Sequence, residues 1–98
     1  EERLRLRAGY SAIDVVGHVN NARYIEWVCD SFTTSWHQEH WLETLQINFD
    51  REIHPEDEVV VKAASLNGQP GAFALSGQNL TQSTEAFTAA VRWRDNPA

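Results

Sequence analysis

The stretch AIDVVGHVNNARYIEW, residues 12–27, decides the fold class because it leads a polar loop into the only convincing helix of the chain. From residue 21 onward, apolar side chains recur every three or four residues, at Ile25, Val28, Cys29, Phe32 and Trp36. This spacing is typical of one face of an α-helix. It predicts one long helix, about four to five turns, that runs from Asn21 to about His37.

Segments with the alternation of β-strands lie on both sides of this predicted helix. RLRLRAGY (residues 3–10) precedes it; WLETLQINFDREI (41–53), EVVVKAASL (58–66), AFALSGQNLT (72–81) and EAFTAAVRWR (85–94) follow. Turn signals separate them, at His54-Pro55 and in NGQPG, residues 67–71. We therefore expect an α+β fold in which about five antiparallel strands curl around one long central helix, because that arrangement buries the apolar faces of both.

Length and composition restrict the class of protein. With 98 residues, 42% of them hydrophobic, the sequence predicts a single domain over residues 1–98 that is soluble and cytoplasmic. The formal net charge of −6 argues against nucleic acid as a partner. No apolar run has the length of a membrane span and no signal peptide opens the chain, so we expect no membrane partner.

A domain of this size has a small core, and a sheet covered by a helix on one side only leaves strand edges open. Both features favour a homodimer or larger homo-oligomer. The chain begins at Glu1 without a methionine, which suggests part of a longer protein.

The motifs of several enzyme classes are missing from the sequence. It contains no nucleophile elbow, phosphate-binding loop or dinucleotide glycine pattern, and we expect no cofactor. Cys29 falls within the apolar spacing of the helix, which favours a buried thiol over a nucleophile. His37 and His40 lie near the predicted helix end without a cysteine partner, so we expect no metal site.

Two segments carry a family likeness. DVVGHVNNARYIEWV, residues 14–28, resembles the D-x-N-x-H-V-N-N-x-x-Y-I-x-W motif in the second hot-dog repeat of the acyl-ACP thioesterases. More loosely, it is similar to the wider group of hot-dog acyl-CoA thioesterases. LQINFDREIHPEDEVVV, residues 45–61, resembles the strand that follows in that family. The resemblance runs from about residue 4 to residue 61 and implies a single hot-dog domain.

The resemblance also implies catalytic residues. Asp14 matches the active-site aspartate of the family, His18 its histidine, and Glu52 the glutamate of the second segment. Either carboxylate could be the base toward water or a nucleophile, and the sequence leaves open which one acts. Two positions depart from the pattern: Val16 stands where the family has asparagine, and Ile53 where many members have cysteine. Valine can neither orient a water molecule nor donate a hydrogen bond.

Three further residues are candidates for substrate binding: Asn20, Asn21 and Tyr24. A helix N-terminus offers free N–H groups and a favourable dipole to a developing oxyanion. Asn20 or Asn21 could equally be the N-cap of the helix, since asparagine is a preferred cap. Tyr24, together with Trp27, is expected in the core, where a helix face of this fold could also line an acyl tunnel.

The leading functional hypothesis is an acyl thioesterase that hydrolyses acyl-ACP or acyl-CoA to a free acid and a thiol. A second hypothesis is a catalytically degenerate hot-dog module that binds acyl groups or dimerises, with Val16 and Ile53 as signs of lost chemistry. A third, a hydratase or dehydratase of the same fold, matches the two segments less closely.

Overall fold

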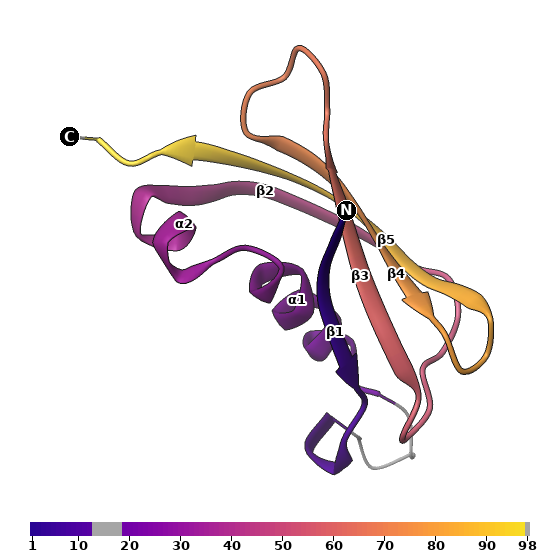
Figure 1. The fold of residues 1–98 in the computed structure, drawn as a ribbon. Helices are drawn as coiled ribbons and strands as arrows, with labels where there is room; N and C mark the ends of the chain where they lie inside the picture. Colours follow the sequence, from indigo (N-terminus) through magenta and orange to yellow (C-terminus); the bar gives the residue numbers. More distant parts are fainter. Residues whose placement is uncertain (13–18, 98) are drawn as a thin grey trace.

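The computed structural model describes residues 1–12 and 19–97, so Asp14, Val16 and His18 lie outside the described residues. Figure 1 shows a curved sheet with the helices on one of its faces. The elements, in chain order, are β1 (Glu2–Arg7), the 3-10 turn η1 (Tyr10–Ala12), α1 (Asn21–Asp30), α2 (Thr34–Glu39), β2 (His40–Phe49), β3 (Glu58–Ser65), β4 (Ala72–Asn79) and β5 (Thr84–Asp95).

The five predicted strands are confirmed. They form one sheet in the order β1-β3-β4-β5-β2, and every neighbouring pair is antiparallel. The predicted turn at residues 67–71 connects β3 and β4, with Gly68 and Gly71 at positive φ. A curved antiparallel sheet around a helix is the predicted hot-dog architecture.

The core lies between the sheet and α1. Alternate side chains of β5 face it as predicted; Phe87, Ala89, Val91 and Trp93 are all buried. Gly77 on β4 lies opposite Phe87, and a Cβ at this position would come within 2.0 Å of the Phe87 ring. The glycine therefore leaves the space that the largest fully buried side chain of the core occupies.

The prediction of one long helix is wrong, because the helical segment divides into α1 and α2. The Ser31 hydroxyl donates to the Trp27 carbonyl (2.8 Å) at the end of α1. Thr33 then adopts an extended backbone, and its hydroxyl accepts from the Trp36 amide (3.2 Å) as the N-cap of α2. Serine and threonine bonds of this kind compete with a continuous helix. The break still leaves Phe32 buried between the two helices.

The apolar face of the helix also differs in part from the predicted one. Tyr24, Trp27 and Val28 point into the core, whereas Ile25 is exposed and Cys29 only partly buried. Among the described residues, no helix combines the length and the apolar character needed to cross a membrane.

Candidate active site

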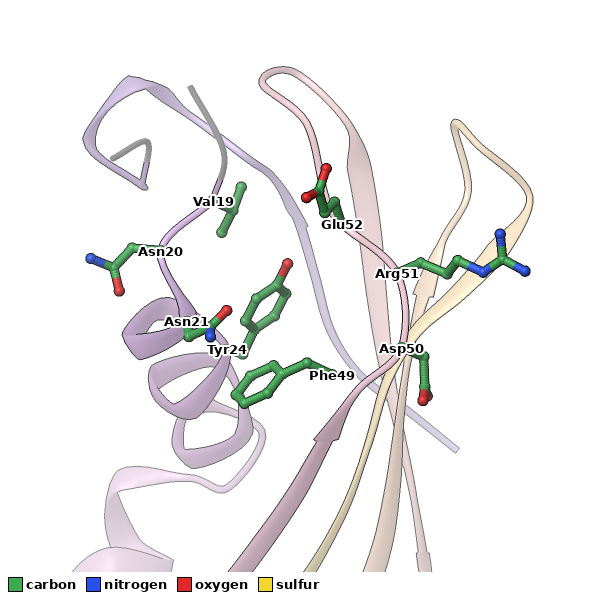
Figure 2. Close-up of a pocket in the computed structure, with 8 residues that line it drawn as sticks. All are labelled: Val19, Asn20, Asn21, Tyr24, Phe49, Asp50, Arg51 and Glu52. Atoms are coloured by element: carbon green, nitrogen blue, oxygen red, sulfur yellow. The ribbon is translucent and has the colours of Figure 1, made fainter. Parts of the chain in front are cut away.

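A pocket of about 410 Å³ lies where α1 begins, opposite the segment that follows β2. Figure 2 shows its lining, which is Val19, Asn20, Asn21 and Tyr24 on one side and Phe49, Asp50, Arg51 and Glu52 on the other. Four of the six site residues predicted from the sequence therefore meet in one pocket, although residues 25–48 separate the two groups along the chain. The other two, Asp14 and His18, lie outside the described residues.

Asn20 is the N-cap of α1. Its backbone is extended, and its side-chain oxygen accepts from the Ala22 amide at 2.8 Å. The backbone N–H of Asn20 in turn donates to the Ala12 carbonyl at 2.9 Å, which ties the start of α1 to η1. In Figure 2 the Asn20 side chain turns away from Tyr24, whereas Asn21 is drawn on the pocket side of the helix. The capping interpretation thus applies to Asn20, and Asn21 is the asparagine better placed to meet a ligand.

Tyr24 forms the floor of the pocket. It is 3% exposed, and its ring contacts Trp27, Phe49 and Phe87 at centroid distances of 5.4, 5.3 and 5.4 Å. Burial raises the pKa of the Tyr24 hydroxyl. The nearby Ile53 backbone opposes this rise, and the Glu52 carboxylate adds to it. The hydroxyl therefore stays protonated at neutral pH.

Glu52 supplies a carboxylate to the rim of the pocket, and a histidine accompanies it. The His54 Nε2 atom lies 3.7 Å from the Glu52 Oε2 atom, and both side chains are about half exposed. The sequence argument passed over His54. The two-residue spacing from Glu52 was the available signal, since residues i and i+2 of an extended chain project to the same side.

A buried polar network supports the turn just beyond this carboxylate. Asp57, 3% exposed, accepts hydrogen bonds from the His54 amide (2.9 Å), Asn79 Nδ2 (2.8 Å) and Gln82 Nε2 (3.4 Å). Burial raises the pKa of Asp57, but the hydrogen bonds from Asn79, His54 and Gln82 outweigh it and hold the pKa below its ordinary value. The network joins the 54–57 turn to the end of β4.

Ile53 is fully buried in the core. The position where the resemblance implies cysteine in many members of the family therefore faces the protein interior and not the pocket. The same segment contributes residues that the sequence argument did not identify as pocket lining, namely Phe49, Asp50 and Arg51. No pattern in a single sequence distinguishes such lining residues from ordinary residues at a strand end.

The remaining cysteine and histidines have structural contacts. Burial, with Asp30 adding to it, raises the pKa of the Cys29 thiol, which argues against a thiolate nucleophile. The His37 ring contacts the Cys29 carbonyl at 2.8 Å, and the His40 ring stacks on Trp36. Over residues 1–12 and 19–97, no group of three or more His, Cys, Asp or Glu side chains could hold a metal ion.

Comparison with known proteins gives one family match, with the acyl-ACP thioesterase C-terminal domain over residues 1–95. A chloroplastic dodecanoyl-acyl-carrier-protein hydrolase from Cinnamomum camphora is 25% identical over 88 residues, which cover 87% of this chain and 23% of that protein. The chain thus spans about a quarter of the length of this curated relative.

Solved structures share the fold. An acyl-ACP thioesterase from Bacteroides thetaiotaomicron superposes with a TM-score of 0.85 and 24% identity over 96% of this chain and 37% of its own. A thioesterase from Thermus thermophilus, in complex with coenzyme A and zinc, gives a TM-score of 0.80 and 16% identity over 99% of this chain and 85% of its own. At these identities the likeness concerns the fold alone.

Proposed function

The chain belongs to the acyl-ACP thioesterase C-terminal domain family, and from this premise we propose that it hydrolyses the thioester of acyl-ACP or acyl-CoA to a free acid and a thiol. The observation that carries the proposal is the pocket in which the start of α1 faces Glu52. Hydrolysis needs a base for water and a site of positive potential for the oxyanion, and this pocket offers both. We also propose a cytoplasmic location for the reaction.

The thioester carbonyl oxygen would lie at the first turn of α1. The backbone N–H groups of this turn have no partner within the helix, and the helix dipole favours negative charge at this end. Asn21 is the first residue of the helix and lines the pocket, so its amide and side chain are the nearest polar groups of α1 to such a ligand. Tyr24 would form the floor beneath the reacting carbonyl.

Glu52 would act as the general base. Its carboxylate accepts a proton from the water that attacks the carbonyl carbon; the tetrahedral intermediate then collapses, and the protonated thiol leaves with the free acid as second product. On the resemblance, Asp14 and His18 complete the site, with His18 handling a proton and Asp14 orienting the groups. In the alternative chemistry a carboxylate attacks directly and water hydrolyses the resulting anhydride.

A second hot-dog unit, in a homodimer or in a longer chain, would complete the acyl site. The described core is filled: Phe87, Ile53, Val28 and Val59 are all below 2% exposed, and the 410 Å³ pocket opens at the surface. We therefore place the acyl chain against a partner and not within this domain.

The two edges of the sheet differ in their suitability for such a partner. At the β1 edge, Arg5 pairs with Glu2 (3.0 Å) and Arg7 with Glu56 (3.2 Å), which protects the strand by charge. The β2 edge is ten residues long, and it ends at Phe49, which is 46% exposed and lines the pocket. A unit docked along β2 would cover Phe49 and close one side of the pocket.

The proposal is tested by incubating the purified chain with medium-chain and long-chain acyl-CoA and acyl-ACP and measuring thiol release. We expect release above the spontaneous rate with at least one carrier. No release from any of them would overturn the hydrolase proposal. In that event, binding of a non-hydrolysable acyl thioether would favour the acyl-binding module instead.

A variant addresses the departure from the family motif. Val16→Asn restores the asparagine that the resemblance places between Asp14 and His18. If the remaining residues of the site perform the family chemistry, this substitution raises the rate of thiol release. An unchanged rate in a folded variant would show that Val16 does not limit the reaction.

A further inference from the structure

Arg51 is the one cationic side chain among the described residues that line the pocket at the start of α1. It is exposed, and none of the ion pairs in the described part of the chain includes it. The arginines that do pair with a glutamate are Arg3, Arg5, Arg7, Arg23 and Arg94. A guanidinium at a pocket rim that no carboxylate neutralises is available to an anion from outside.

The backbone holds Arg51 at this rim. The N–H groups of Asp50 and Arg51 donate to the Ala86 carbonyl at 2.9 and 3.1 Å, so the segment after β2 is tied to β5. Figure 2 shows the side chains of Arg51 and Glu52 leaving this segment in different directions. The Glu52 carboxylate lies toward Val19, and the Arg51 guanidinium lies farther from α1. The guanidinium is therefore beside the place proposed for the thioester carbonyl and not in it.

The proposed substrates carry an anion at some distance from the thioester. In acyl-CoA and acyl-ACP alike, the thioester sulfur belongs to a pantetheine arm whose other end is a phosphate ester. A thioester carbonyl at the start of α1 therefore places this phosphate outside the pocket. The whole chain carries a formal net charge of −6, which repels such an anion at long range. A cation at the rim offsets this repulsion locally, where screening by salt is weakest.

We propose that Arg51 binds the phosphate at the end of the pantetheine arm and thereby selects phosphorylated carriers over simple thioesters. This inference rests on the proposed function, because it names a specificity-determining residue for that reaction. A guanidinium can donate two parallel hydrogen bonds to phosphate oxygens. Asp50 and Glu52 are the other charged residues of the described lining, so Arg51 is the group there that can attract a further anion.

The kinetic test compares wild type and Arg51→Ala on one acyl chain carried by phosphopantetheine, by CoA, by ACP and by pantetheine, which lacks the phosphate. We expect KM to rise about tenfold with acyl-phosphopantetheine and with at least one of the two carriers, and that carrier is then the source of the phosphate. The kcat should not change, because the contact is the same in the ground state and the transition state. Equal rises with and without the phosphate would overturn the inference. So would the absence of a rise with acyl-phosphopantetheine, or with both carriers.

Arg92→Ala is the matched control, because it removes the same side chain and the same charge at another place. Arg92 lies on β5, six residues after Ala86 and about 20 Å from it along the strand, and its side chain donates to Gln69 Oε1 at 3.3 Å. This variant should leave all four KM values unchanged. A rise in KM equal to that of Arg51→Ala would show a general effect of net charge and would overturn the inference.

A binding measurement without turnover keeps the two proposals distinguishable. The octyl thioethers of phosphopantetheine and of pantetheine differ only in the phosphate, and they contain no thioester to hydrolyse. In isothermal titration calorimetry, wild type should bind the phosphorylated thioether about tenfold more tightly, and Arg51→Ala should bind both equally. Equal affinities in wild type, or binding of neither compound, would overturn the inference. A wild-type chain that prefers the phosphorylated thioether but releases no thiol from any substrate would count against the proposed function alone.

Discussion

Asp57 is a buried carboxylate on which much of the local stability near the candidate site depends. It accepts three hydrogen bonds while 3% exposed. Asp57→Ala removes the carboxylate acceptor. The side-chain amide of Asn79 and the backbone N–H of His54 then lose the hydrogen bonds that they donate to Asp57. Hydrogen bonds to a charged group contribute about 1.5–3 kcal/mol each, so two well-formed bonds give an expected loss of roughly 3 kcal/mol in the free energy of unfolding.

Thermal unfolding followed by circular dichroism measures this loss. For a domain of this size, 3 kcal/mol corresponds to a fall in Tm of roughly 12–24 °C. Asp95→Ala is the control, because Asp95 is 92% exposed and pairs only with His40 among the described residues. The control should shift Tm by less than about 2 °C. Equal shifts in the two variants would refute the assignment of a stabilising network to Asp57.

The same network predicts a pH dependence. The pKa of Asp57 is lowered in the folded protein, so its stabilising contribution is fully present above the ordinary carboxyl pKa of about 4. The contribution is lost as the pH falls through the lowered folded value. The stability difference between wild type and Asp57→Ala should therefore shrink at acid pH. A difference that stays constant down to about pH 2 would contradict this account.

Three further changes have defined outcomes. Gly77→Ala places a methyl group within 2.0 Å of the Phe87 ring, so denaturant unfolding should show a loss of about 3 kcal/mol or no cooperative transition; wild-type stability would contradict the packing argument. Asn20→Ala removes the acceptor for the Ala22 amide and should cost about 1 kcal/mol in the same assay, while an unchanged midpoint would show that the cap contributes nothing. Phe49→Lys puts a charge at the open β2 edge and should convert a wild-type dimer to monomer in sedimentation equilibrium. A monomeric wild type would refute the homodimer, and a variant that stays dimeric would refute the β2 edge as its interface.

The strands could be predicted from the sequence because their apolar faces repeat with the period of two that the sheet requires. Phe87 and Val91 share the buried face of β5 for this reason. The helix was harder to predict from the sequence. Its period was correct, and Tyr24 is buried as expected, but Ile25 proved exposed, since the width and direction of an apolar face depend on what packs against it.

The helix break depended on local competition that a periodic pattern does not show. Ser31 and Thr33 lie between apolar residues at helical spacing, yet their hydroxyls take up backbone groups at the two helix ends. Similarly, the sequence left two asparagines as alternative caps, and the backbone geometry assigns the cap to Asn20.

Two kinds of information locate the candidate site: the resemblance in the sequence and the fold. The resemblance singled out Glu52 and the Asn20–Tyr24 segment, and the fold brings them to one pocket. The support around Glu52 was beyond prediction, because Ala86 and Val19 reach that segment through backbone hydrogen bonds that leave no pattern in side-chain identity.

The most direct test of the central claim is the kcat/KM of Glu52→Gln for an acyl-ACP or acyl-CoA that the wild type hydrolyses. Glu58→Gln is the matched control, since Glu58 begins β3 outside the pocket and pairs with Arg5. The account predicts a loss of about 10²- to 10⁴-fold for Glu52→Gln and wild-type activity for Glu58→Gln, with both variants folded. Wild-type thiol release by folded Glu52→Gln would contradict the assignment of this carboxylate, and of the pocket it borders, to the reaction.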